Sequence, residues 1–250
     1  MLPSASDANA TLVVSLRPSG DHAAMRRAAG ACGLRVAALS PWKIMVSDTA
    51  PTRAALRAAC GAQIVIVTSP AAARAAARLT PLRPRRGQSW CAIGHGTAQA
   101  LRRAGIARVE VPDRMDSEGL LALPGLREVR GTSVGLLTAP GGRDQIAPAL
   151  RRRGAELLRA DVYERVPLRL STTMIARLRA SPDPWLLPVS SGEALQRVLA
   201  QAPPDLARRL RDARVLAASA RIAEIARACG CRDVRIAPGP APRQLLAAAC

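Results

Sequence analysis

Short apolar runs rich in β-branched residues alternate along this chain with amphipathic, alanine-rich segments. The run TLVVSL at 11–16 has the continuous apolar character of a strand buried on both faces of a parallel sheet. The next segment, 22–32, has apolar residues at helical spacing and ends at Gly33, which is typical of a helix C-terminus. Further strands are predicted at 35–40, 63–68, 89–93, 108–111 and 133–138, and further helices at 71–79, 97–104 and 118–126, with another ending at 153. This alternation predicts an α/β protein with parallel sheets.

The chain also repeats itself, with an offset of about 121 to 125 residues. The segment IVTSP at 66–70 recurs as LPVSS at 187–191, and CAIGHGTAQ at 91–99 recurs as AASARIAE at 217–224. Because such matches keep their order along the chain, they predict a duplication and therefore two similar α/β halves.

Two segments occupy equivalent places in the repeat and are expected to cross between the halves. These are Trp42–Asp48 and Asp161–Leu168, each predicted to pass from a strand into a less regular stretch. Two crossings permit a hinged pair of domains with a cleft between them, where ligands are often bound.

Charge and composition narrow the class of protein. Among 250 residues, 37 are Lys or Arg and 18 are Asp or Glu, which gives a formal charge of +19. Part of this charge reflects the codon bias of a GC-rich genome, and whether it also indicates an anionic ligand stays open. The first residues lack the pattern of a secretory signal, and no apolar run approaches the roughly 20 residues of a membrane span, so a cytoplasmic protein without membrane contact is expected. Only two histidines and one close cysteine pair, Cys229 and Cys231, are present, so no metal site is expected.

Five turns with small residues are predicted to follow strands and to begin helices: 68–70, 94–96, 116–117, 141–142 and 190–192. Such turns are ordinary helix caps or places where backbone N–H groups bind an anion, and both interpretations stay open. Gly94 and Gly96 resemble part of a dinucleotide fingerprint, but Gln99 takes the place of its third glycine. No nucleotide cofactor is therefore expected.

Three other features each have a plain structural interpretation. No hydrolase motif accompanies His95, and the run 151–153 of three arginines is typical of a solvated helix end more than of a nucleic-acid patch. Tyr163, the only tyrosine, lies in a predicted crossing segment, where it is equally well explained as a hinge anchor or as a proton donor.

Taken together, these motifs resemble the uroporphyrinogen-III synthase family over nearly the whole chain, from Leu12 to Ala248. The strongest pieces are Thr68-Ser69-Pro70, Ala92-Ile93-Gly94 with Thr97-Ala98, Ser117-Glu118-Gly119-Leu120-Leu121, Gly141-Gly142-Arg143 and Val162-Tyr163. The resemblance implies two parallel-sheet α/β domains joined by a two-stranded linker, with a cleft between them. One domain would combine 1–40 with 168–250, the other would be 48–160, and the linkers would be 41–47 and 161–167.

The resemblance also implies an activity. The family is a cofactor-independent hydro-lyase of tetrapyrrole (heme) biosynthesis, which cyclises hydroxymethylbilane to uroporphyrinogen III with loss of water and inversion of ring D. It implies that Tyr163 is the acid that assists loss of the hydroxyl, and it predicts a monomer with this substrate as its partner and with no metal. The implied substrate-binding residues are Ser69, Gly94, Thr97, Ser117, Gly142, Arg143, Ser190, Ser191 and Ser219.

Some positions depart from the family pattern. Ile222 stands where a threonine is common, Ser219-Ala220 replaces Gly-Pro, and Val189 replaces a threonine, so the C-terminal half loses hydroxyl donors. These losses leave room for a weakened enzyme. Two alternatives therefore stay open: a two-lobed binding protein for an anionic small molecule and, less favoured because no known module is present, a basic nucleic-acid-binding protein.

Overall fold

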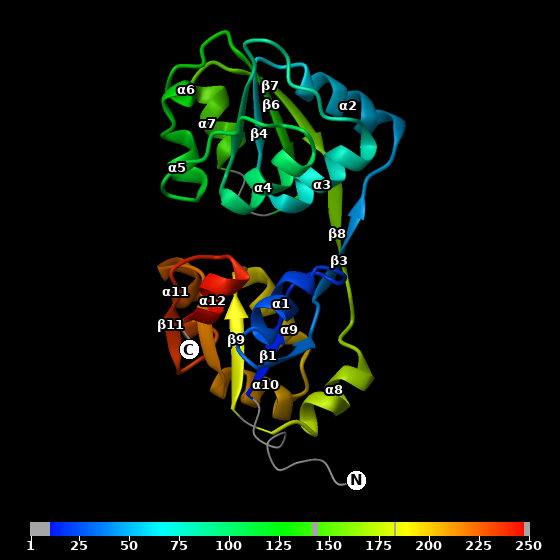
Figure 1. The fold of residues 1–250 in the computed structure, drawn as a ribbon, viewed down its shortest axis with the longest axis vertical. Coiled ribbons are helices and arrows are strands. Elements are labelled where there is room, and N and C mark those ends of the chain that lie inside the picture. The colour runs from blue at the N-terminus through cyan, green and yellow to red at the C-terminus, as the bar shows by residue number, and fades with distance from the viewer. Residues whose placement is uncertain (1–10, 142–144, 183, 248–250) are drawn as a thin grey trace. The chain divides into compact units, whose positions relative to one another are not determined.

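The computed structural model describes residues 11–141, 145–182 and 184–247, and the chain forms two compact units. Unit 1 runs to Lys43 and resumes at Val166, and unit 2 is Ile44–Arg165. Each unit contains a parallel sheet between helices (Figure 1), so the predicted α/β fold with two parallel-sheet domains is confirmed.

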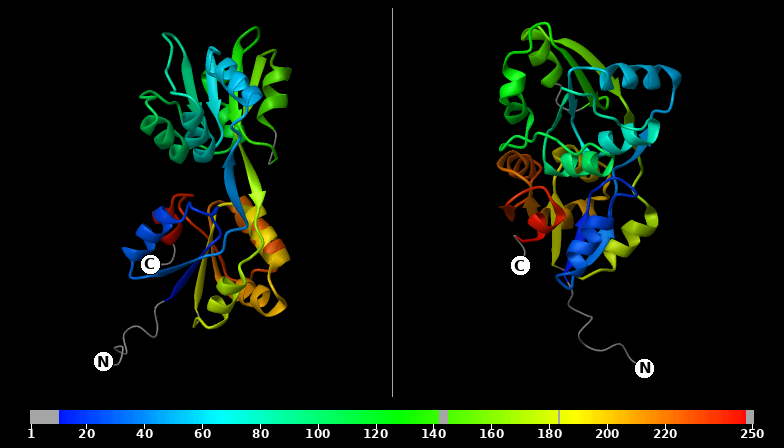
Figure 2. Two further views of the ribbon diagram at one scale, coloured as in Figure 1. Left: turned by 90° about the vertical axis from the view of Figure 1, so that its right-hand side faces the viewer. Right: turned by 45° about the horizontal axis from the view of Figure 1, so that its top comes forward.

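Unit 1 has a five-stranded parallel sheet of order β11-β10-β9-β1-β2. Its strands are β1 (Leu12–Ser15), β2 (Arg35–Ala38), β9 (Trp185–Val189), β10 (Arg214–Ala217) and β11 (Val234–Ile236). On one face, α1 (Ala23–Gly30) and α12 (Pro242–Ala247) cover a core around Val13, Met25 and Leu216. The other face carries α8 (Thr172–Arg179), α9 (Gly192–Gln201), α10 (Pro204–Asp212) and α11 (Ala220–Ala228), as Figure 2 shows.

Unit 2 has a four-stranded parallel sheet of order β5-β4-β6-β7. Its strands are β4 (Ile64–Val67), β5 (Ser89–Ala92), β6 (Ser133–Thr138) and β7 (Glu156–Asp161). Successive residues of a strand point to opposite faces, so Val65 and Val67 pack under α2 (Ala50–Cys60), α3 (Pro70–Leu79) and α4 (His95–Arg103). Ile66 packs on the other side, under α5 (Ser117–Leu121), α6 (Pro124–Arg127) and α7 (Ile146–Arg152).

The strand registers support the predicted duplication. The order β10-β9-β1-β2 in unit 1 corresponds strand by strand to β5-β4-β6-β7 in unit 2. Ile64 of β4 pairs with Val134 of β6 in unit 2, and Leu186 pairs with Val13 between the corresponding strands β9 and β1 of unit 1. Each unit therefore combines the first part of one copy with the second part of the other.

The two crossing segments are regular strands, so the prediction of less regular stretches there was wrong. Strands β3 (Trp42–Val46) and β8 (Tyr163–Pro167) form a two-stranded sheet (Figure 2). Backbone hydrogen bonds flank this pairing at both ends, from Ser47 N–H to Val162 O at 3.1 Å and from Leu168 N–H to Pro41 O at 3.0 Å. The two borders between the units both lie within these strands, and the cleft stays a prediction.

Two other predicted elements differ from the structure because of proline. The strand predicted at 108–111 is reduced to a single bridge between Cys91 and Glu110, followed by Pro112, which has no N–H to extend a ladder. The helix predicted at 118–126 is divided into α5 and α6, because Leu123 precedes Pro124 and takes ψ 137°, outside the helical range.

Candidate active site

A buried tyrosine hydroxyl and a helix-capping serine meet in unit 2. Ser69 follows β4 and caps α3, and its Oγ accepts the Ala72 N–H at 3.0 Å. The same Oγ lies 3.2 Å from the hydroxyl oxygen of Tyr163, the first residue of β8. Tyr163 is 3% exposed and its ring belongs to the core beneath α3 and α4. The fold thus joins two predicted site residues that are 94 positions apart.

The direction of this hydrogen bond decides what Tyr163 can do. Either hydroxyl can be the donor. In one arrangement the Ser69 oxygen accepts the Ala72 N–H while its own O–H is donated to Tyr163. The Tyr163 proton is then available to a bound molecule, and the Ser69 hydroxyl can stabilise negative charge that develops on the phenol oxygen.

More hydroxyls lie at the same carboxyl edge of the sheet. Thr68, at the end of β4, donates to the hydroxyl of Thr138 at 2.9 Å, and Thr138 ends the neighbouring strand β6. Thr68 belongs to a turn that the sequence predicts, whereas Thr138 was missed. Its signal is a threonine at the carboxyl end of a predicted strand, shortly before the predicted turn at 141–142.

Gly94 begins α4 with extended backbone and no side-chain cap. A Cβ at this position would lie 3.3 Å from Met115 Sδ, and one at Gly96 would lie 3.5 Å from the Pro70 ring. The starts of α3 and α4 are therefore neighbours, with the partly exposed Met115 beside them. Met115 was not predicted as part of a site, because its exposed apolar side chain becomes evident only in the fold.

Asp116, which precedes the predicted contact Ser117, is a helix cap. Its carboxylate accepts the Gly119 N–H at 2.8 Å and pairs with Arg114. Burial opposes its charge, but the hydrogen bonds from Gly119 and Arg114 outweigh that effect, so the pKa of Asp116 is lowered. Asp116 therefore keeps its charge at neutral pH and is unsuited to donate a proton. Ser117 is the first residue of α5.

Thr97, another predicted contact, lies in the first turn of α4 and is only 2% exposed. Like Tyr163, it is a buried side chain of unit 2 that carries a hydroxyl group.

The remaining predicted contacts are serines of unit 1 and two residues of a turn. Ser191 caps α9 by accepting the Ala194 N–H at 3.3 Å, and Ser219 caps α11 by accepting the Ile222 N–H at 3.4 Å. Ser190, at the end of β9, is exposed. Gly142 and Arg143 lie outside the described residues.

The departure from the family pattern at Ile222 has a structural consequence. The Ile222 side chain is 2% exposed, so it fills core space in α11 where the family commonly has a hydroxyl.

The buried thiols are poor nucleophiles. Burial, with a smaller effect of Glu110, raises the pKa of Cys91 to about 12, and burial raises the pKa of Cys60 to about 11. Since the thiolate is the reactive form, neither is suited to covalent catalysis at neutral pH.

Residues 11–141, 145–182 and 184–247 contain neither a cluster of metal ligands nor a membrane-spanning helix. No group of three or more His, Cys, Asp or Glu residues there could hold a metal ion. No helix there is long and apolar enough to cross a membrane.

Comparison with known proteins gives consistent matches. The family model described as "Uroporphyrinogen-III synthase HemD" matches residues 23–247. The uroporphyrinogen-III synthase of Escherichia coli (strain K12) is 33% identical over 150 residues, which are 59% of this chain and 61% of that protein. The Salmonella typhimurium enzyme is 33% identical over 159 residues, 63% of each chain. The matched region thus spans about three fifths of the length of these relatives.

Two solved structures share the fold. The uroporphyrinogen III synthase of Thermus thermophilus, as a triple mutant, aligns with a TM-score of 0.62 and 18% identity, over 96% of this chain and 97% of that one. The uroporphyrinogen-III synthetase of Helicobacter pylori aligns with a TM-score of 0.60 and 14% identity, over 96% and 98%.

Proposed function

The chain belongs to the uroporphyrinogen-III synthase family, and on that premise we propose that it cyclises hydroxymethylbilane to uroporphyrinogen III, with loss of water and inversion of ring D, in tetrapyrrole (heme) biosynthesis. It would be a lyase that works without a cofactor. The observation that supports the chemistry of this proposal is the hydrogen bond between Ser69 and Tyr163, because it gives the buried phenol a hydroxyl partner.

In the first step the substrate hydroxyl leaves as water. Tyr163 donates its proton to the departing oxygen, and the Ser69 O–H stabilises the charge that develops on the phenol oxygen. A pyrrole nitrogen supplies the electron pair that expels the hydroxyl, so general-acid assistance by Tyr163 contributes only modestly to the rate. The electron pair therefore comes from the substrate and the proton from the protein.

The second task is to position the resulting cation. Attack by the substituted carbon of ring D gives a spiro intermediate, and cleavage and re-closure invert that ring. The final closure releases one proton from the ring carbon, which balances the proton that Tyr163 donated and restores the phenol. The linear tetrapyrrole also cyclises unaided to the type I isomer, so the protein must hold the chain in the conformation that favours the inverting closure.

The substrate carries many carboxylates, and this chain is strongly basic. We assign carboxylate contacts to backbone N–H groups at the starts of α3 and α4, at Ser69 and Gly94, where the helix dipoles favour anions. Further proposed contacts are Thr97 through its backbone, Ser117, Gly142, Arg143, Ser190, Ser191 and Ser219. A monomeric state and a cytoplasmic location remain predictions from the sequence.

The test is to supply freshly made hydroxymethylbilane to the purified protein with no added metal or nucleotide, and to oxidise and separate the products. Type III uroporphyrin is expected. Binding of the substrate with only type I product would favour the alternative of a non-catalytic binding protein.

A further inference from the structure

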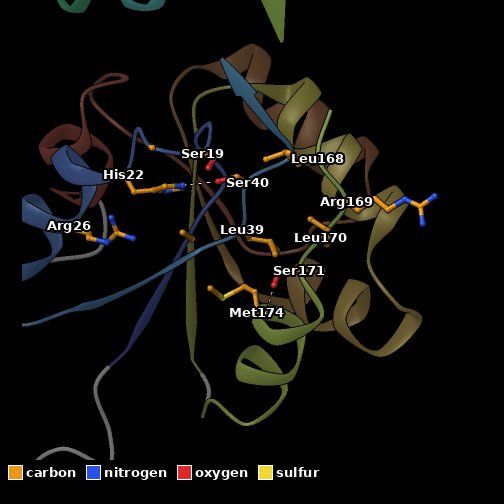
Figure 3. Close-up of a pocket in the computed structure, with 12 residues that line it drawn as sticks. Ser19, His22, Arg26, Leu39, Ser40, Leu168, Arg169, Leu170, Ser171 and Met174 are labelled. Carbon is orange, nitrogen blue, oxygen red and sulfur yellow. Dashed lines mark hydrogen bonds between the residues drawn. The ribbon is translucent and has the colours of Figure 1, made fainter. Parts of the chain in front are cut away.

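Unit 1 contains a cavity of about 320 Å³ that the proposed chemistry does not use. It lies between the segment that leads into α1, the end of β2 and the segment at 168–174 (Figure 3). Its lining combines hydroxyl groups, two arginines and apolar side chains, and it includes no Asp or Glu among the described residues. A cavity of this composition favours an organic anion with an apolar body.

One wall of the cavity is held by a buried histidine. His22 is 3% exposed, and its two ring nitrogens lie 3.0 Å from the Ser15 hydroxyl and 2.8 Å from the Ser40 hydroxyl. Burial, followed by the neighbouring Arg26 and Arg17, lowers the pKa of His22. His22 is therefore neutral at pH 7, and its role is to fix the Ser40 hydroxyl at the cavity wall, as Figure 3 shows.

The positive charge of the cavity comes from Arg26. Within the described ranges, neither the Arg26 nor the Arg169 side chain has a hydrogen-bond or ion-pair partner, whereas nearby Arg17 is paired with Asp21 at 3.0 Å. In Figure 3 the Arg169 side chain points away from the other lining residues, and Arg26 extends from α1. Among the residues that the structure describes, Arg26 is thus a cation without a protein anion, at the edge of a cavity that lacks acids.

The opposite part of the lining is apolar, with Leu39, Leu168, Leu170 and Met174. Ligand cavities generally measure about 300–1,000 Å³, so this one is at the small end and suits a single ring with its substituents. It is too small to enclose four linked rings.

We propose that this cavity binds one pyrrole ring with carboxylate substituents, in which Arg26 pairs with a carboxylate, Ser40 hydrogen-bonds to the ligand and Met174 packs on the ring. The presence of the cavity does not depend on the proposed function, but the assignment of its ligand as a pyrrole ring rests on that function. A free monopyrrole and one ring of the linear tetrapyrrole offer the same chemistry.

The test is calorimetric titration of the full chain with a pyrrole that carries one acetate and one propionate group. Arg26→Gln is expected to weaken binding about tenfold, because a charge-assisted hydrogen bond is lost, and Met174→Trp is expected to block it by filling the cavity. The matched control is Arg27→Gln, an exposed neighbour on the same helix that does not line the cavity. The proposal would be overturned if the unchanged protein did not bind the probe. It would also be overturned if the Arg26→Gln variant bound the probe, and the unchanged protein bound the neutral dimethyl ester of the probe, as tightly as the unchanged protein binds the probe itself.

The steady-state KM for hydroxymethylbilane identifies the source of the ring. A KM raised about tenfold in Arg26→Gln, with Arg27→Gln unchanged, supports a ring of the tetrapyrrole. Weaker binding of the probe with an unchanged KM supports a free monopyrrole. Since calorimetry needs no turnover, failure of the cavity proposal is distinguishable from failure to form type III product.

Discussion

The Oγ of Ser69 accepts the Ala72 N–H at 3.0 Å and lies 3.2 Å from the hydroxyl oxygen of Tyr163. One side chain thus begins α3 and orients the phenol at the start of β8. The sequence predicted Ser69 as a substrate contact and Tyr163 as an acid. From this contact we propose that Ser69 also positions Tyr163.

Tyr163→Phe is expected to lower kcat about tenfold, because general-acid assistance gives about 10²–10⁴-fold and the pyrrole nitrogen already expels the hydroxyl readily. The ring stays in the core, so the melting temperature should change little. The measurement is kcat at saturating substrate beside a melting curve. Full activity in the folded variant would leave Tyr163 as an anchor only.

Ser69→Ala removes a helix cap and the partner of Tyr163. The matched control is Thr49→Ala, since Thr49 caps α2 in the same unit by accepting the Thr52 N–H at 3.2 Å and has no part in the proposed site. Each alanine variant is expected to lose about 1 kcal/mol of unfolding free energy, but only Ser69→Ala should lower kcat, by a few-fold.

A double-mutant cycle isolates the positioning role. If Ser69 acts through Tyr163, then Ser69→Ala should have little further effect on kcat in the Tyr163→Phe background. An undiminished effect of Ser69→Ala in that background would show that Ser69 acts independently.

Gly119→Ala is expected to destabilise unit 2 by about 1–3 kcal/mol, because its Cβ would clash with the Arg114 carbonyl oxygen and the backbone must shift. Gly125→Ala is the control, since a Cβ there meets nothing within 4 Å. Chemical denaturation compares the two variants. Equal stabilities would contradict the close backbone approach at Gly119.

The buried His22 predicts a pH dependence of stability. Its pKa is lowered in the folded state by burial and by Arg26 and Arg17, so the unfolded chain binds the proton more readily. The stabilisation is present above about pH 6.5 and is lost as pH falls toward the lowered pKa, with a slope of at most about 1.4 kcal/mol per pH unit.

The check is urea denaturation between about pH 7.5 and pH 5.5, a range that brackets the ordinary pKa of histidine. His22→Asn should flatten the decline in stability, whereas His95→Asn, which changes the other histidine, should retain it. A decline that is the same in both variants and in the unchanged protein would rule out His22 as its source.

Much of the fold could be predicted from the sequence. Runs such as 64–67 are apolar enough to predict buried strands, and the duplication gave the equivalence of the halves. The helices α2, α8 and α10 were missed. In α10 the only buried residues are Leu206, Ala207 and Leu210, and its remaining positions are mostly charged, so the apolar signal is short.

The site could be predicted only in part. Serines that precede helices can be recognised in the sequence as caps. The approach of Tyr163 to Ser69 joins residues far apart in the chain and depends on the pairing of β3 with β8, and no short stretch of the sequence indicates that pairing. The cavity was missed for a similar reason. His22 reaches Ser15 and Ser40 only because β1 and β2 are neighbouring strands.

The most direct measurement of the central claim is the fraction of type III isomer formed from fresh hydroxymethylbilane as the concentration of this protein is raised. Unaided closure gives type I, so a heat-denatured sample sets the baseline. We predict that the type III fraction rises with protein concentration until it accounts for nearly all of the product, without metal or nucleotide. Product that stays type I at every concentration of folded protein would contradict the account.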